Sequence, residues 1–245
     1  MNSSFLYRLC RRYVNYVNGE NNSDILTNGE FRWLSEVLPR CATVLDVGAN
    51  IGDWASLALR INPAVNVHCF EPSLKSFERL QENLSNHSAQ VKLNPFGLSA
   101  AQETKTLYLF DDCAGNNSLY SREGLANQQS ISESVHLETL DLYCQDQGLE
   151  RVDLLKIDVE GHELSVLQGA LQMLDQGRIE KIQFEYGGTF IDARILLKDI
   201  FDLLIPLGYR LYKIHPNRLA AAEGYEQRYE NFQYQNFVAL KHRSA

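Results

Sequence analysis

Residues 44–59 read VLDVGANIGDWASLAL, which combines the features of a strand, a tight turn and a helix. The apolar run reaches Asp46, and the turn that follows contains Gly48, Asn50 and Gly52. Short, continuous apolar runs of this kind are typical of buried parallel strands. Glycines in such a turn let the backbone approach a ligand at the start of a helix. The segment therefore predicts an α/β domain with a ligand-binding turn.

The same alternation continues along the 245-residue chain. Further strands are predicted at the apolar runs of residues 65–72, 90–97, 152–161, 181–188, 207–214 and 232–240. Apolar side chains at helical spacing predict helices at residues 53–61, 74–84, 163–174 and 195–204. Residues 111–134 are polar with little periodicity and are predicted to form a long loop. Together these patterns predict a doubly wound sheet with helices on both faces.

The first 40 residues are predicted to form a helical extension that packs on a domain comprising residues 41–245. Residues 5–17 and 31–38 show helical spacing, and Pro39 is expected to end the second helix. A membrane-surface position for the first helix is the alternative, disfavoured because it has only three basic residues. Those arginines also argue against a signal peptide, and no apolar run approaches the roughly 20 residues that span a bilayer. A soluble protein is expected.

Charge and cysteine content exclude several classes of protein. The net charge of −8 argues against binding to a nucleic-acid backbone, because that binding relies on many lysines and arginines. No Cys-x-x-Cys pair, which would suggest zinc or redox chemistry, occurs among Cys10, Cys41, Cys69, Cys113 and Cys144. Cys41 and Cys69 lie at apolar runs and are expected to be buried thiols, which fits a reducing cytoplasm.

Two acidic residues help to identify the ligand of the turn. A dinucleotide-binding loop would follow Gly-x-Gly-x-x-Gly, whereas here Ala49 and Asn50 separate only two glycines. Asp46, directly before the turn, suits a cationic amino-acid cofactor better than a diphosphate. Glu71 ends the next predicted strand, where its carboxylate can accept both ribose hydroxyl hydrogens of an adenosine. That contact serves nicotinamide cofactors equally well, so these residues alone indicate an adenosine-like ligand.

The fourth predicted strand carries the most specific motif. Residues 153–170 read DLLKIDVEGHELSVLQGA, and here the chain resembles the FkbM-type methyltransferase family, whose hallmark is Lys-Ile-Asp-Val-Glu-Gly-x-Glu followed by Val-Leu-x-Gly. Other similar segments occur in the family's order: VLDVGANIGDWA, FEPS at 70–73, NNSL at 116–119, VHLETLDLY at 135–143 and IQFEYGG at 182–188. The resemblance covers roughly residues 44–188.

The resemblance implies a Rossmann-like class I methyltransferase with a seven-stranded, mostly parallel sheet and S-adenosylmethionine at its carboxyl edge. It implies transfer to an oxygen, commonly a hydroxyl of a sugar, polyketide or other natural product. By position, Gly48, Asn50 and Gly52 would line the methionine part, Glu71 the ribose, and Leu98 and Ser99 the adenine. Where many relatives have an aspartate after this serine, the chain has Ala100, so one carboxylate beside the adenine is missing.

Several titratable groups follow the fourth and fifth strands, where an alcohol acceptor would have to lose its proton. We hypothesise that His162 or Glu160 accepts this proton while Asp158 orients the pair or contacts the methionine ammonium. Glu185 is a further candidate for the base. Alternatively, Glu160 and Glu163 could serve only to stabilise the helix that follows, because acidic side chains interact favourably with the dipole at a helix N-terminus. The carboxylates could also hold Mg²⁺, although no metal-ligand spacing in the sequence requires it.

Two other functions remain open at this stage. An NAD-dependent oxidoreductase would lack its third glycine, and its only Tyr-x-x-x-Lys match is Tyr209 to Lys213 in a late strand. A non-catalytic binding subunit could keep the fold. A sugar or glycan acceptor is the first expectation, because the long loop is polar and aromatic side chains could stack on a pyranose. These groups are Asp111, Asp112, Asn116, Asn117 and Ser118 with Tyr120, Tyr186 and Phe190.

Overall fold

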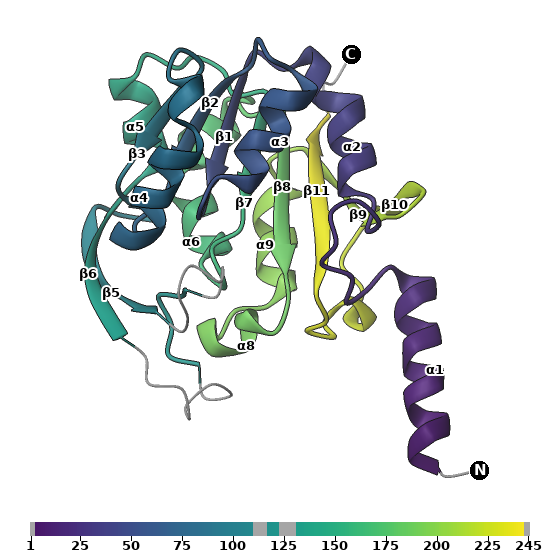
Figure 1. Ribbon diagram of the computed structural model, residues 1–245. Helices are drawn as coiled ribbons and strands as arrows, with labels where there is room; N and C mark the ends of the chain where they lie inside the picture. The colour runs from purple at the N-terminus through teal and green to yellow at the C-terminus, as the bar shows by residue number, and fades with distance from the viewer. Residues whose placement is uncertain (1–2, 110–116, 123–130, 243–245) are drawn as a thin grey trace.

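The computed structural model describes residues 3–109, 117–122 and 131–242. Within these residues the centre is an eight-stranded sheet in the order β10-β9-β11-β8-β7-β1-β2-β3 (Figure 1). The parallel strands are β1 (Thr43–Val47), β2 (Asn66–Phe70), β3 (Val91–Asn94), β7 (Leu154–Ile157) and β8 (Lys181–Tyr186). Antiparallel pairing adds β9 (Tyr209–His215), β10 (Arg218–Ala222) and β11 (Gln235–Lys241). The sheet thus has one strand more than the predicted seven, because β10 folds back on β9 as an edge hairpin.

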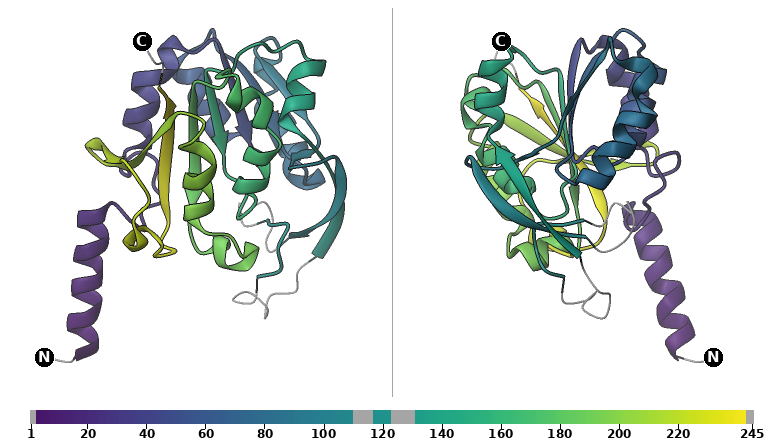
Figure 2. Two further views of the ribbon diagram at one scale, coloured as in Figure 1. Left: turned by 180° about the vertical axis from the view of Figure 1, so that it is seen from behind. Right: turned by 60° about the vertical axis from the view of Figure 1, so that its left-hand side comes forward.

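Helices cover both faces of this sheet, as predicted (Figure 2). One face packs against α2 (Glu30–Val37), α3 (Asp53–Ile61) and α4 (Leu74–Asn83). The other packs against α5 (Leu140–Asp146), α6 (Glu163–Gln168), α7 (Leu171–Asp175) and α9 (Leu197–Leu204). Successive side chains of β1 point to opposite faces, so Val44 joins one core while Leu45 and Val47 join the other. Cys41 and Cys69 are buried, as expected, and Cys113 lies outside the described residues.

The predicted helix over residues 163–174 is broken into α6 and α7 at Gly169. A Cβ at this glycine would lie 2.0 Å from the backbone oxygen of Ser99, so the helix must stop where the two backbones touch. Two further helices, α5 and α8 (Thr189–Ala193), lack a sequence prediction. Short 3-10 helices lie at Leu38–Arg40, Ser85–His87 and Gln227–Tyr229. Pro39 lies inside the first of these, so the chain turns once more before leaving the helix.

A second, three-stranded sheet stands beside the carboxyl edge of the first. It consists of β4 (Gly97–Leu98), β6 (Ile131–Glu138) and β5 (Glu103–Leu109), in that order. β5 and β6 pair antiparallel, and Leu107, Val135 and Leu137 form a small core of their own. The predicted loop was therefore too long, since residues 131–134 are strand. The proposed acceptor contacts Asp111, Asp112 and Asn116 lie outside the described residues.

The two N-terminal helices differ in how they meet the domain. Trp33 and Leu34 of α2 are buried against the sheet. By contrast, α1 (Ser3–Asn18) extends away from the domain (Figure 1). Its apolar side chains between Phe5 and Val17 are exposed. The expectation that α1 packs on the domain is therefore corrected. Within the described ranges, no helix combines the length and apolar character needed to cross a membrane.

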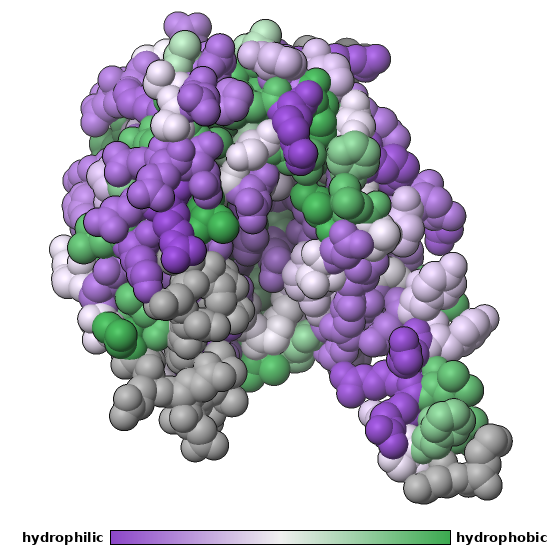
Figure 3. Space-filling view, viewed as in Figure 1, coloured by the Kyte–Doolittle hydropathy of each residue, from purple (hydrophilic) through white to green (hydrophobic). Residues whose placement is uncertain are grey.

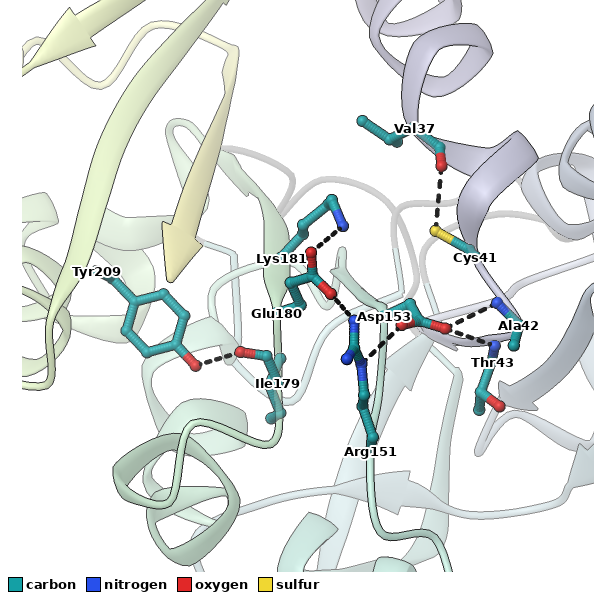
Figure 4. Close-up of polar contacts among 10 residues, drawn as sticks. All are labelled: Val37, Cys41, Ala42, Thr43, Arg151, Asp153, Ile179, Glu180, Lys181 and Tyr209. Carbon is teal, nitrogen blue, oxygen red and sulfur yellow. Dashed lines mark hydrogen bonds and ion pairs between the residues drawn. The ribbon is translucent and has the colours of Figure 1, made fainter. Parts of the chain in front are cut away.

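Asp153 joins the amino ends of β1 and β7, at the sheet edge opposite the carboxyl ends of the parallel strands (Figure 4). One carboxylate oxygen accepts hydrogen bonds from the backbone nitrogens of Ala42 at 2.7 Å and Thr43 at 3.1 Å. The other accepts from Arg151 Nε at 3.0 Å, and Arg151 also pairs with Glu180. Burial opposes ionisation, but these donors outweigh it and hold the pKa of Asp153 below its usual value.

Replacing Asp153 with Asn is expected to lower the free energy of unfolding at pH 7 by about 1–3 kcal/mol, because two backbone donors lose a charged acceptor. Since the folded pKa of Asp153 is lowered, its contribution is complete above the unfolded value near about 3.9 and is lost as the pH falls through the lower folded value. Urea unfolding across this range measures both effects, and the deficit should shrink in acid.

Glu180→Gln is the matched control. It removes a partly exposed ion pair of Arg151 and is expected to change stability by less than about 1 kcal/mol. A deficit for Asp153→Asn that stays constant from neutral pH into acid would contradict the assigned role.

Candidate functional site

The carboxyl ends of β1, β2, β7 and β8 bring the predicted site residues together. Gly48 follows β1, Glu71 follows β2, Asp158 follows β7, and Glu185 lies near the end of β8. Ligand sites of open parallel sheets lie at this edge. Two neighbouring cavities open there, and Asp158 borders both.

The first cavity, here called the turn pocket, holds most of the predicted cofactor residues. It is lined by polar groups and by apolar side chains of the small sheet: Gly48, Asn50, Glu71, Leu98, Leu107, Asn117, Leu119, Leu137, Asp158, Glu160 and His162. Three predicted cofactor residues, Asp46, Gly52 and Ser99, are not part of this lining. Ser99 bonds to His162, which lines the pocket, and Asp46 pairs with Lys156 beneath the turn, whereas Gly52 packs against α4.

The glycines of the turn serve backbone packing. Gly48 has φ of +79°, and a Cβ there would lie 1.8 Å from the backbone oxygen of Asp158. Gly52 has φ of +92°, and its Cβ would lie 2.8 Å from a methyl carbon of Leu80 on α4. Gly48 thus allows the turns after β1 and β7 to touch, whereas Gly52 allows α3 to approach α4. The predicted contact of Gly52 with the cofactor stays a prediction.

Glu71 closes the pocket at the end of β2. Its two carboxylate oxygens each accept a backbone hydrogen bond, from Asn50 N at 2.9 Å and from Ser73 N at 2.9 Å. Burial raises the pKa of Glu71 to about 7, even though both backbone donors oppose the shift. Each oxygen retains a second lone pair that can accept a hydrogen bond from a ligand hydroxyl.

Lys156, which the sequence interpretation passed over, is the ion-pair partner of the two aspartates. Its Nζ lies 3.0 Å from Asp46 and 3.5 Å from Asp158, and it donates to Gly48 O at 3.3 Å. Although burial disfavours a charged ammonium, both aspartates raise the pKa of Lys156 above its ordinary value. Asp46 is fully buried and lines neither cavity, and its ion pair with Lys156 links it to the turn.

His162 lines the turn pocket with both ring nitrogens already engaged. Nδ1 lies 2.8 Å from the hydroxyl of Tyr120, and Nε2 lies 3.0 Å from Ser99 Oγ, which itself donates to Glu103 at 2.8 Å. Burial lowers the pKa of His162 to about 4, so the ring is neutral at pH 7. Both ring nitrogens of His162 therefore have partners, and the hypothesis that His162 removes the acceptor proton stays a prediction.

Residues 117–122 form a strap across the turn pocket. Ser118 Oγ donates to Glu160 O at 2.8 Å, and Arg122 forms an ion pair with the Glu160 carboxylate. Asn117 and Leu119, on either side of Ser118, line the pocket. Among the described residues, the buried Asn117 Oδ1 has no hydrogen-bond partner, so a buried acceptor is left for a ligand.

Three carboxylates meet where the two cavities join. Oxygens of Asp158, Glu160 and Glu185 lie within 4.8 Å of one another. Burial and the neighbouring carboxylate of Asp158 raise the pKa of Glu160 to about 7. The same two causes raise the pKa of Glu185 well above its usual value. Glu163 is different, because its oxygens accept from Val159 N at 3.1 Å and Gly161 N at 3.0 Å and so support the turn.

The second cavity, here called the acidic cleft, lies on the other side of Asp158. Its charged wall contains Glu30, Asp53, Asp158 and Glu185 together with Lys156 and Arg60, and its aromatic wall contains Trp54 and Tyr234. Trp54 Nε1 is buried without a partner among the described residues. Tyr186 and Phe190 are fully buried in the core, so neither can stack on a sugar ring as predicted. Trp54 and Tyr234 are the aromatic residues that the sequence interpretation missed.

Comparisons with known proteins agree with this arrangement. A sequence model described as the methyltransferase FkbM domain matches residues 46–211. The fold is similar to a crystal structure titled methyltransferase FkbM from Methylobacillus flagellatus, with a TM-score of 0.51 at 15% identity. That similarity covers 82% of this chain and 43% of the other. At such low identity it demonstrates the class I methyltransferase fold alone.

Three curated relatives are similar over about 60% of the chain. AMB antimetabolite synthetase AmbE of Pseudomonas aeruginosa is 34% identical over 60% of this chain and 8% of its own length. 2-O-methyltransferase NoeI of Sinorhizobium fredii is 28% identical over 66% of this chain and 70% of its own length. Hexuronic acid methyltransferase AglP of Haloferax volcanii is 29% identical over 63% of this chain and 60% of its own length. The matched region thus spans less than two thirds of AmbE and AglP.

Lys156→Met is expected to destabilise the fold by about 3–5 kcal/mol, because it leaves Asp46 charged, buried and without its partner. Adding Asp46→Asn to the same chain removes that charge and should recover part of the loss. Thermal and urea unfolding of the single and double variants measure the coupling. Equal stabilities for Lys156→Met and the double variant would contradict an energetic link between the two residues.

Proposed function

The chain belongs to the methyltransferase FkbM family, and we propose that it transfers a methyl group from S-adenosylmethionine to a hydroxyl oxygen of a sugar or related natural product. One observation carries this proposal. Asp158 borders both the turn pocket and the acidic cleft, so a cofactor in one cavity and an acceptor in the other would meet at the three carboxylates.

The residues of the turn pocket fit this cofactor. Glu71 offers carboxylate oxygens to ribose hydroxyls, and the side chains of Leu98, Leu107 and Leu137 offer an apolar surface to a purine ring. Asn117 Oδ1, which has no partner within residues 3–109, 117–122 and 131–242, is an acceptor for a nucleoside donor. Asp158 and Glu160 supply negative charge near a methionine ammonium and a sulfonium. When bound, the sulfonium supplies an activated methyl group, which leaves the protein to align the acceptor oxygen and remove its proton.

Glu185 is the residue that we propose as the proton acceptor. It lines the acidic cleft and not the turn pocket, which places it on the acceptor side of Asp158. Asp158 and Glu160 already pair with Lys156 and Arg122, whereas no hydrogen bond or ion pair to a described residue is found for the Glu185 side chain. Its raised pKa makes the ionised form a stronger base.

An uncharged polyol fits the acidic cleft better than an anionic sugar does. The cleft is lined by more acidic than basic side chains, so a carboxylated acceptor would be repelled. The acidic ones are Glu30, Asp53, Asp158 and Glu185, and the basic ones are Arg60 and Lys156. Tyr234, which is half-buried at the cleft wall, supplies an aromatic ring and a hydroxyl group, a combination suited to a pyranose with hydroxyl groups. The names of NoeI and AglP describe methyl transfer to an oxygen and to a hexuronic acid, respectively. We propose the same type of reaction here with a neutral sugar.

The oxidoreductase alternative does not account for these residues. Tyr209 is buried and donates its hydroxyl hydrogen to Ile179 O at 2.7 Å, at the sheet edge opposite the site (Figure 4). Lys213 pairs with Glu20 at 2.9 Å. A non-catalytic subunit would bind the cofactor without consuming it, so the two can be separated by measuring binding and turnover on one preparation.

Glu185→Gln is expected to lower kcat by about 10²–10⁴-fold while the Kd for S-adenosylmethionine stays within about twofold, because the proton acceptor is lost and the turn pocket is kept. Isothermal titration gives the Kd, and transfer of a labelled methyl group gives the rate. Acceptors are tested in matched pairs of a neutral glycoside and the corresponding uronide, and the neutral member should react faster.

Glu78→Gln, on the exposed surface of α4, is the control and should behave as the unmodified chain does. Absence of measurable affinity for S-adenosylmethionine and S-adenosylhomocysteine contradicts the proposed function. Affinity without turnover on any hydroxylated acceptor identifies a non-catalytic subunit.

A bound Mg²⁺ would need oxygen atoms of Asp158, Glu160 and Glu185, which lie close enough to one another to share an ion. We propose metal-independent catalysis, because Lys156 and Arg122 already supply positive charge to two of these carboxylates. Turnover after exhaustive EDTA treatment is expected to stay within about twofold of the untreated value. Loss of turnover that added Mg²⁺ restores would instead assign the three carboxylates as metal ligands.

A further inference from the structure

The exposed apolar surface of this protein is concentrated on α1. Eight of the 17 exposed large hydrophobic side chains in the described residues lie on this helix, between Phe5 and Val17. Their exposed fractions run from 45% for Leu6 to 80% for Tyr16. In Figure 3 the far end of α1 displays apolar side chains beside polar ones at the surface. Monomeric soluble proteins rarely leave contiguous apolar surface of this extent unless it binds something.

Polar and apolar side chains occupy separate sides of α1. At 100° per residue, the apolar side chains from Phe5 to Val17 fall within an arc of about 200°. Arg8, Arg11 and Arg12 fall in the remaining arc with Ser4, Asn15 and Asn18. The helix has 16 residues and is thus about 24 Å long. A strongly amphipathic helix with a wide apolar arc is suited to the boundary between water and a lipid layer.

The charge of α1 is opposite to that of the chain as a whole. The helix contains three arginines and no acidic residue, whereas the chain carries a net charge of −8. A surface that receives this helix should therefore be negatively charged. The apolar arc of α1 is wider than the narrow seam that one partner helix covers, so pairing with a second copy of the helix would leave part of this arc exposed, whereas a lipid layer would cover all of it.

The joint between α1 and the domain is well defined. Glu20 pairs with Lys213 at 2.9 Å and accepts from Asn231 at 2.9 Å, and Asn21 N donates to Tyr234 O at 2.8 Å. Arg11 is the helix residue that donates to the domain, to Gln233 at 3.2 Å. The joint thus fixes the carboxyl end of α1 next to Tyr234, which lines the acidic cleft. From there the helix extends beyond the sheet end at which both cavities open (Figure 1).

We propose that α1 binds the surface of a membrane containing anionic lipid, with its apolar arc among the acyl chains and its arginines at the headgroups. The apolar arc supplies hydrophobic burial, and the arginines supply attraction to phosphate and carboxylate groups. Because the net charge of the chain is negative, binding depends on this helix. The inference stands apart from the methyl-transfer activity, since it uses none of the residues of the two cavities.

Sedimentation with vesicles tests this proposal on the full chain, using phosphatidylcholine alone or mixed with phosphatidylserine. The chain should sediment with the anionic vesicles and remain largely in solution with the neutral ones. Replacing Arg8, Arg11 and Arg12 together with Gln should lower the partition coefficient roughly 100-fold, at about fivefold for each charge. Replacing Leu9 and Tyr13 together with Ser should lower it by more than about tenfold.

A matched control replaces three exposed arginines outside α1 with Gln, namely Arg40, Arg79 and Arg178, and should leave partitioning unchanged. A Leu9→Trp variant gives a direct readout, because Trp33 and Trp54 are buried and should contribute a constant background. Its fluorescence should shift to the blue only with anionic vesicles. Failure of the unmodified chain to sediment overturns the proposal. So does a concentration-dependent dimer that Leu9→Ser abolishes, which would assign the apolar arc to a second copy.

Discussion

A buried ammonium between two carboxylates organises the functional edge of this protein. Lys156 and Asp46 are direct register partners on the parallel strands β7 and β1, so their side chains meet beneath the turn. The same ammonium reaches Asp158 and the backbone oxygen of Gly48. It therefore holds the turns after β1 and β7 in contact at Gly48, where a Cβ would clash with the backbone oxygen of Asp158. Without this charge, Asp46 would be an uncompensated buried anion and the carboxylate group would lose its nearest cation.

From this point the structure divides the site into two sides with different surroundings. The turn pocket is covered by the strap and by the small sheet, whose leucines give it an apolar wall. The acidic cleft is lined by more varied side chains, namely carboxylates, Arg60 and two aromatic side chains. Asp158 is common to both, while Glu160 and Glu185 stand on opposite sides of it. An in-line transfer between two molecules requires this kind of arrangement, because each must be held separately and meet at one point.

The sequence predicted most of the central sheet because its strands are short apolar runs and its helices have clear spacing. It also predicted that Glu71, Asp158, Glu160 and Glu185 lie at one edge of the sheet, because residues at the carboxyl ends of neighbouring parallel strands come together there. It could not predict which side chains engage one another across the chain. His162 bonds to Tyr120 and Ser99, which are 42 and 63 residues away in sequence. A sequence pattern within one segment gives no information about contacts with residues so distant in the sequence.

Two other misses have the same physical origin. The strands β5 and β6 alternate polar and apolar residues weakly, because one small core and not the main one receives their side chains. The apolar spacing of α1 predicted a helix correctly but could not say what covers it, because amphipathicity identifies a face and not its partner. Lys156 carried a signal that was available: a lysine inside an apolar strand needs a buried anion, and Asp46 was already assigned to the neighbouring strand.

Placing Asp158, Glu160 and Glu185 close together lowers the stability of the fold, and this loss of stability bears on function. Three partly buried carboxylates with oxygens within 4.8 Å of one another repel one another, and the raised pKa values of Glu160 and Glu185 mean that ionising these two groups weakens the fold. Among the described residues, ion pairs with Lys156 and Arg122 offset part of this charge. Apolar or amide side chains at these positions would stabilise the domain more effectively. A protein that served only as a scaffold has no use for such an arrangement, whereas a site that must attract a cation and remove a proton requires it.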